Sequence, residues 1–132
     1  MKRAALFSLL SLSAIGAGAA QIADAAAIRA IVGEAAGQSD RAMLAVAGAL
    51  RNRGTLQGVY GASSSVTCHS SPDVWARAAR AWAQSAQHIS QAEVRLAAGC
   101  RYFGCPADAP YFLHTLHFHP VVTIGQITFY KP

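Results

Sequence analysis

The sequence predicts a small α+β domain that is mainly helical and carries short strands at its C-terminal end. Apolar residues recur at helical spacing between residues 24 and 99, whereas β-branched and aromatic residues gather after Gly99. The chain has 132 residues, so one domain with one modest core is expected. The sequence contains no internal repeat, low-complexity tail or interdomain linker.

The first twenty residues have the pattern of a secretory signal peptide. Two basic residues precede an uncharged run that is rich in Leu, Ala and Ser and ends in small residues. Cleavage is expected after Ala19, Ala20 or Ala25. The run is less apolar than the roughly 20 strongly apolar residues of a spanning helix. The sequence therefore predicts an exported protein, periplasmic or at the cell wall, with no stable membrane insertion and one domain over residues 21–132.

The charge balance is mildly basic. Removal of Lys2 and Arg3 with the signal peptide would lower the formal net charge by two, from +5 to +3. This excess suits an anionic wall polymer without requiring one. The arginines between residues 77 and 101 are spread singly, and there is no basic run or nucleic-acid module, so a nucleic-acid partner is not expected.

The first two predicted helices are joined by a very short turn. Asp24 is expected to cap the first helix, and Gly37 to end it. Ser39 and Asp40 are expected to start the second helix, which ends at Gly54. The core-facing residues recur at helical spacing: Ile28, Ile31, Val32 and Ala35 in the first helix, and Met43, Leu44, Ala47 and Leu50 in the second.

An irregular connection follows, and then two more helices. Residues 54–71 are rich in Gly, Ser and Thr, a composition typical of segments that line clefts. Pro72 predicts the first position of a third helix. Ser90 and Glu93 predict a capping box for a fourth, which ends at Gly99. In the third helix the stripe expected to face the core consists of Trp75, Ala79, Trp82 and Ala86. The opposite face carries Arg77 and Arg80.

The end of the chain is expected to form the strands. Residues 111–118 and 121–130 are rich in aromatic and β-branched residues, and Pro120 and Gly125 interrupt them. Two or three short strands, including one hairpin, are predicted there.

Glu34 is the acidic residue without an evident structural role. The other five have one: Asp24, Asp40 and Asp73 at helix starts, Glu93 in the capping box, and Asp108 in a turn. Glu34 falls in the last turn of the first helix, where the helix dipole disfavours a carboxylate. Its small neighbours Gly33, Ala35 and Ala36 would leave room for a ligand. We expect a partly desolvated acid at a cleft edge; the alternative is a solvated residue paired with an arginine.

Three blocks of sequence around Glu34 resemble one known family. Residues 30–38 (AIVGEAAGQ), 43–47 (MLAVA) and 50–54 (LRNRG) are similar in order and spacing to the SleB-type cell wall hydrolases, the spore cortex-lytic enzymes. The final segment, with Pro110-Tyr111-Phe112, Thr123-Ile124-Gly125 and Phe129-Tyr130, resembles the last strands of that family.

The resemblance implies a lysozyme-like domain that acts on peptidoglycan. Such a domain cuts between N-acetylmuramic acid and N-acetylglucosamine, by hydrolysis or as a lytic transglycosylase, with Glu34 as its acid. We expect a monomer with no cofactor or metal. A one-carboxylate mechanism is favoured, because Asp40 and Asp108 have plainer explanations.

Two departures from the family pattern favour a catalytically impaired peptidoglycan-binding protein as the alternative. Val121 or Val122 stands where the family usually has tryptophan, and Ile127 stands where it often has histidine. Both changes are expected to affect substrate binding more than the fold.

Four further residues are candidates for substrate binding. Asn52 either hydrogen-bonds sugar or holds the loop beyond the second helix. Tyr60, Tyr111 and Tyr130 either stack on sugar rings or fill the core, and Tyr111 is the preferred binding candidate.

The cysteines and histidines leave three interpretations open. A disulfide between Cys100 and Cys105 is preferred for an oxidising compartment. His114, His117 and His119 form a polar cleft wall or, with Cys68 or Asp108, a zinc site; on a strand, His117 and His119 would share one face. Cys68 and a later histidine would form the dyad of a wall peptidase.

Overall fold

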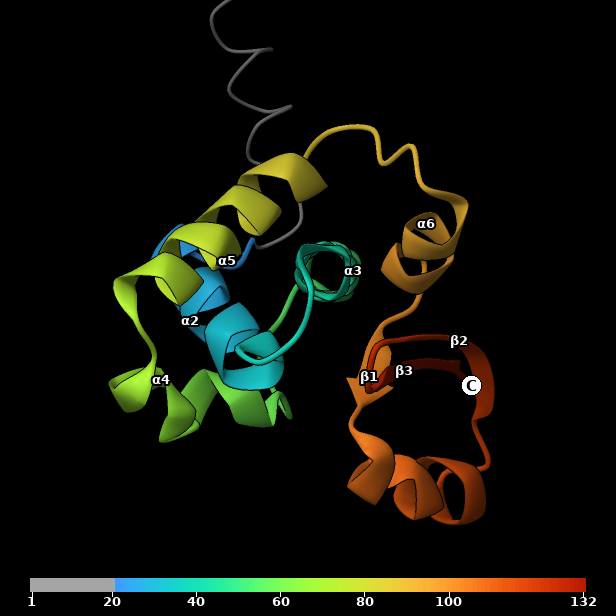
Figure 1. Ribbon diagram of the computed structural model, residues 1–132. Coiled ribbons are helices and arrows are strands. Elements are labelled where there is room, and N and C mark those ends of the chain that lie inside the picture. The colour runs from blue at the N-terminus through green and yellow to red at the C-terminus, as the bar shows by residue number, and fades with distance from the viewer. Residues whose placement is uncertain (1–20) are drawn as a thin grey trace, which may run out of the picture.

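The computed structural model describes residues 21–132, which are mainly helical and end in a three-stranded antiparallel sheet (Figure 1). This confirms the predicted fold class. The predicted signal peptide lies outside these residues. No helix within residues 21–132 is long and apolar enough to cross a bilayer.

The elements are α2 (Asp24–Ala35), α3 (Asp40–Arg53), η1 (Tyr60–Ser63), α4 (Val66–His69), α5 (Pro72–Ser85), α6 (Ala92–Ala98), β1 (Tyr102–Gly104), η2 (Pro106–Asp108), η3 (Tyr111–Thr115), β2 (His119–Ile124) and β3 (Ile127–Lys131).

Helix α3 lies at the centre of the domain, with α2 and α5 on one side and α6 on the other (Figure 1). Every residue from Ala42 to Leu50 except the half-buried Leu44 is buried, so the helix has a wider apolar face than a surface helix would. Its predicted ends are confirmed. The Ser39 hydroxyl accepts from the Ala42 N–H, and Gly54 ends the helix in the left-handed conformation (φ 74°).

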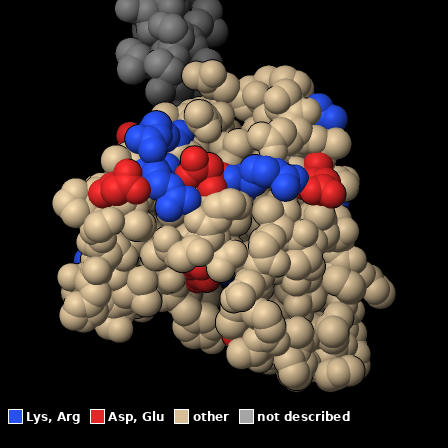
Figure 2. Space-filling model, viewed as in Figure 1, with Lys and Arg blue, Asp and Glu red and all other residues tan. Residues whose placement is uncertain are grey.

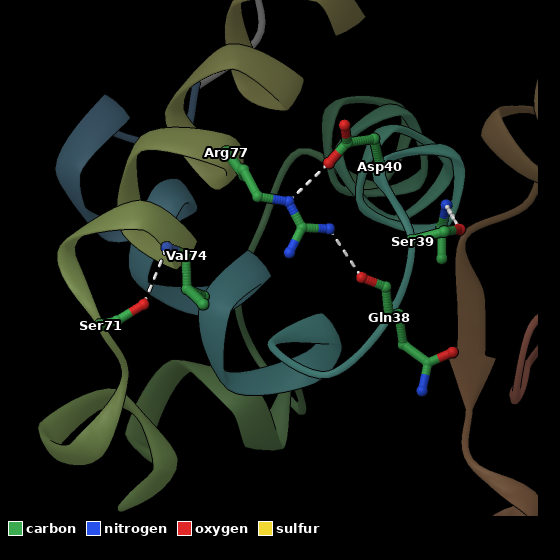
Figure 3. Close-up of polar contacts among 7 residues, drawn as sticks. Gln38, Ser39, Asp40, Ser71, Val74 and Arg77 are labelled. Carbon is green, nitrogen blue, oxygen red and sulfur yellow. Dashed lines mark hydrogen bonds and ion pairs between the residues drawn. The ribbon is translucent and has the colours of Figure 1, made fainter.

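Helix α5 begins as predicted, and its predicted core face is confirmed in part. The Ser71 hydroxyl accepts from the Val74 N–H (Figure 3). Trp82 is buried and Trp75 packs against the core, as predicted, whereas the other buried residues are Ala78 and Ala81 rather than Ala79 and Ala86.

The prediction that Arg77 points away from the core was wrong. Residue 77 is four positions before Ala81 and therefore borders the buried stripe. Its guanidinium donates to the Asp40 carboxylate (2.6 Å) and to the Gln38 carbonyl (2.8 Å), and so ties α5 to the α2–α3 turn (Figure 3).

Two predicted N-terminal caps were also wrong. Ala23 precedes α2, and the Asp24 carboxylate accepts from the indole N–H of Trp82 (2.7 Å) instead of capping the helix. Of the three predicted cleavage sites, the one after Ala25 would remove this contact. At α6 no capping box forms, because the helix begins after Gln91 and Glu93 pairs with Arg41 (2.7 Å).

The sheet has the order β1-β3-β2, with a β2–β3 hairpin as predicted. The prediction of a strand within residues 111–118 was wrong, since η3 is a π-helical turn that starts after Pro110 and closes with the Leu116 N–H donating to the Tyr111 carbonyl (3.0 Å). β1 was missed because it is only three residues long and pairs with a strand far along the chain, with Tyr102 opposite Tyr130.

Candidate functional site

Glu34 lies in the last turn of α2, and its side chain is half-buried. Its Oε1 accepts a hydrogen bond from the backbone N–H of Gly61 in η1, at 2.7 Å. The expected partial desolvation is therefore present, and the expected alternative of a solvated carboxylate paired with an arginine is not. Neither ion pair of the described residues involves Glu34.

Two glycines allow η1 to approach α2 this closely. A Cβ added at Gly33 would lie 2.0 Å from the Gly61 carbonyl oxygen. A Cβ added at Gly61 would lie 2.5 Å from Cγ of Glu34 and 2.7 Å from the Ala30 carbonyl oxygen. The small residue before Glu34 thus makes room for the η1 backbone, and it also lines the cleft, as expected for Gly33.

The surroundings of Glu34 raise its pKa. Burial is the largest cause, because a charged carboxylate loses hydration there. The Gly61 N–H lowers the pKa by stabilising the anion, and the negative charge of Asp108 raises it further. The balance favours the protonated acid at higher pH than for a free glutamate.

Glu34 opens onto a cleft of about 680 Å³. This volume lies within the roughly 300–1,000 Å³ of small-molecule sites. In Figure 2 a hollow with recessed acidic atoms separates two largely uncharged lobes, below a band of charged side chains. One wall is the end of α2 with residues 58–65, and the other is built from residues 102–116. The predicted cleft-lining role of the Gly- and Ser-rich connection is confirmed.

The three candidate tyrosines occupy different environments. Tyr60 is 82% exposed and Tyr111 is 55% exposed, and they line opposite walls of the cleft. Tyr130 is 1% exposed, does not line the cleft, and stacks on Phe112 with ring centroids 4.3 Å apart. Tyr60 and Tyr111 can therefore meet a ligand, whereas Tyr130 belongs to the core.

Asn52 links the end of α3 to the segment between α6 and β1. Its amide donates to the carbonyls of Gly99 and Cys100, at 3.0 and 3.3 Å, and it does not line the cleft. The structural interpretation of Asn52 is thus the one the contacts support. The preceding Arg51 likewise anchors α5, donating to the Trp82 carbonyl at 2.6 Å.

Arg53 is a cleft residue that the sequence did not single out. Its guanidinium donates to the carbonyl of Gln57, just before the wall segment 58–65, and to that of Arg101, just before the wall segment that begins with β1. It also lies over the Tyr102 ring, 5.3 Å from the centroid. An arginine at the end of a helix is usually explained by the helix dipole, so only the folded chain reveals this contact.

Asp108 is the second acidic residue that lines the cleft. The predicted turn role is confirmed, because its Oδ2 accepts from the N–H of Cys105 at 3.0 Å. Its place opposite the Glu34 wall was missed, since sequence positions 74 apart give no sign of proximity.

The predicted disulfide between Cys100 and Cys105 is absent, and all three cysteines are free. Cys100 is buried, where its thiol donates to the Leu96 carbonyl, and Cys105 is exposed. Strand β1 runs between the two residues and keeps them apart.

The histidine interpretations also change. His114 lies in η3 and His119 begins β2, so the predicted alternation along one strand was wrong. Within residues 21–132 no three His, Cys, Asp or Glu side chains are placed to hold a metal ion. Cys68 lies in α4 outside the cleft, and among the described residues no hydrogen bond joins it to a histidine.

Comparisons of this chain with family models, with curated proteins and with solved structures find no match.

Proposed function

We propose that this protein cleaves the glycan strands of peptidoglycan, between N-acetylmuramic acid and N-acetylglucosamine, with Glu34 as the catalytic acid. The observation that carries the proposal is a half-buried carboxyl with a raised pKa that opens onto a cleft. Glycosidic cleavage near neutral pH needs such an acid, because the leaving oxygen must receive a proton as its bond breaks.

The walls of the cleft support a carbohydrate ligand. The exposed rings of Tyr60 and Tyr111 stand on opposite walls, where they would contact the apolar faces of sugar rings. The hydroxyls of Ser64 and Ser65 lie on the same wall as Tyr60 and would hydrogen-bond sugar hydroxyls. A mostly uncharged cleft suits a glycan better than a strongly charged polymer.

The N–H of Gly61 gives Glu34 its orientation. With Oε1 held at 2.7 Å by this donor, the acid proton lies on the other oxygen, Oε2. In the proposed reaction Oε2 donates its proton to the glycosidic oxygen, and the resulting carboxylate later accepts a proton from the attacking hydroxyl. Attack by water gives hydrolysis; attack by the 6-hydroxyl of the same sugar gives an anhydro product.

Export belongs to the same proposal. Peptidoglycan lies outside the cytoplasm, so the signal-peptide pattern of residues 1–20 fits a wall substrate. We propose a periplasmic or cell-wall location and action as a monomer without a cofactor.

The test compares wild type with E34Q on purified peptidoglycan, by zymography and by mass spectrometry of the released fragments. We expect kcat to fall at least about 10²-fold in E34Q, because glutamine keeps the acceptor for Gly61 but has no acid proton. Anhydro sugars among the fragments would identify transglycosylation.

A non-catalytic peptidoglycan-binding protein gives the opposite pattern. It would pull down with the insoluble wall as both wild type and E34Q, and neither would release fragments. Equal release by both proteins would also reject Glu34 as the acid.

A further inference from the structure

We propose that Asp108 is a second catalytic carboxylate, which faces the positive charge that develops on the sugar ring. This inference rests on the proposed function, and it replaces the one-carboxylate mechanism favoured by the sequence. It is carried by the placement of Asp108 in the same cleft as Glu34, on the opposite wall.

The side chain of Asp108 is fixed by its own turn. Its Oδ2 accepts from the Cys105 N–H at 3.0 Å and from the Cys105 thiol at 3.2 Å. A Cβ added at Gly104 would lie 2.8 Å from the same oxygen, so β1 presents bare backbone to the carboxylate. This packing leaves little freedom to the group, which is therefore preorganised.

The second oxygen of Asp108 is available to a ligand. Both of its hydrogen bonds within residues 21–132 fall on Oδ2, which leaves Oδ1 without a protein donor there. The ion pairs of the described chain are Arg41–Glu93 and Arg77–Asp40, so no cation neutralises Asp108. An unpaired carboxylate at the edge of a cleft is suited to stabilise an oxocarbenium-like state.

The charge of Asp108 also acts on Glu34. The two acids share one cleft, and the negative charge of Asp108 raises the pKa of Glu34. The other titratable groups that line this cleft are the guanidinium of Arg53, the thiol of Cys105 and the hydroxyls of Tyr60, Tyr102 and Tyr111. Arg53 is the one cation among them; its two terminal nitrogens each donate to a backbone carbonyl, and it forms no ion pair with either acid. The arrangement separates the roles of the two carboxyls: Glu34 donates the proton, and Asp108 supplies the negative charge.

The proposed step balances without any further reagent. Glu34 gives its proton to the glycosidic oxygen, and the bond from that oxygen to the anomeric carbon breaks with its electron pair on the oxygen. The positive charge left on the sugar faces Oδ1 of Asp108. The oxygen of water, or the 6-hydroxyl of the same sugar, then bonds to the anomeric carbon and returns its proton to Glu34. The carboxylate of Asp108 forms no bond and transfers no proton in this step.

The experiment measures pH–rate profiles of the full chain on purified glycan strands for wild type, D108N and D73N. D108N keeps an oxygen that accepts from the Cys105 N–H, so the turn is retained. We expect kcat of D108N to fall at least about tenfold at the wild-type optimum, because one transition-state charge interaction is lost. We also expect its alkaline limb to move to lower pH, since loss of the neighbouring charge lowers the pKa of Glu34.

D73N is the matched control, because Asp73 is exposed at the start of α5 and does not line the cleft. It should keep the wild-type profile. A D108N variant with wild-type kcat and an unmoved alkaline limb would overturn the role of Asp108 while leaving Glu34 as the acid. A wild type that releases no fragments would instead overturn the proposed function itself.

Discussion

Glu34 is held in an environment that opposes its ionisation. Burial, the C-terminal end of α2 and the charge of Asp108 all disfavour the carboxylate, whereas the Gly61 N–H alone favours it. A surface glutamate without these neighbours would be better hydrated and would add nothing to catalysis. Local destabilisation of this kind is common at functional sites.

The raised pKa of Glu34 has a defined effect on stability. Below the pKa of the unfolded chain the group is protonated in both states and contributes nothing. Above the pKa of the unfolded chain, the unfolded state ionises freely while the folded state still holds the proton, so wild type loses stability until the pH has passed the raised folded-state pKa. E34Q has no charge at position 34. We expect equal Tm values at acidic pH and a Tm of E34Q a few degrees higher at neutral to alkaline pH, measured by thermal denaturation across that range.

A matched control is Glu93→Gln, which removes an exposed carboxylate paired with Arg41. Surface ion pairs contribute only about 0–1 kcal/mol, so this variant should gain no stability at any pH. A Tm difference between E34Q and wild type that does not grow with pH would show that the folded chain does not penalise the Glu34 anion.

At the scale of elements, the contact between α2 and η1 sets the geometry of the acid. Gly61→Ala would bring a methyl group to 2.5 Å from Cγ of Glu34, so η1 or the side chain must move. We expect a loss of about 1–3 kcal/mol in the free energy of unfolding, as for overpacked cores. The rate of glycan cleavage should fall roughly tenfold or more, because the donor that orients the acid is displaced.

Gly37→Ala provides the control, since a Cβ at Gly37 meets no atom within 4 Å. This variant should keep full activity and gain up to about 1 kcal/mol from the lower entropy of its unfolded chain. Urea denaturation and initial rates on the same preparations measure both quantities. If G61A matched G37A in both, the close approach of η1 would have no bearing on the site.

The elements that the sequence predicted well are those defined by local chemistry. Ser39, Gly54 and the Ser71-Pro72 pair act through hydrogen bonds or backbone angles within a few residues, and the structure confirms each. The failures arise where distant partners compete. Asp24 and Glu93 satisfy Trp82 and Arg41 instead of the nearby helix starts, and residues 111–115 form a π-helical turn despite their strand-like composition.

At the scale of the whole molecule, one part of the candidate site could be predicted from the sequence and another part could not. Glu34 was predictable because its isolation among the acidic residues is visible along the chain. The opposite wall was not, because Asp108 reaches the cleft only after β1 pairs with β3 and η2 packs on Gly104. Sequence patterns report which face of an element is apolar, and they carry little information about which polar residues will meet.

Arg53 connects the two walls of the cleft, and its replacement should lower both the stability and the activity of the protein. Its guanidinium donates to the carbonyls of Gln57 and Arg101, while its buried Nε has no partner among the described residues. In R53K a single ammonium cannot span both carbonyls. We expect the free energy of unfolding to fall by about 1–3 kcal/mol.

We also expect kcat/KM of R53K on glycan strands to fall about tenfold, because a shift of one wall relative to the other misplaces the sugar against Glu34. The matched control is Arg80→Lys, at an exposed position of α5 outside the cleft, which should leave both quantities unchanged. Urea denaturation and initial rates separate the two effects. A stable R53K with wild-type kcat/KM would mean that the cleft keeps its width without this connection, and that packing of the sheet and the helices alone sets the distance between its walls.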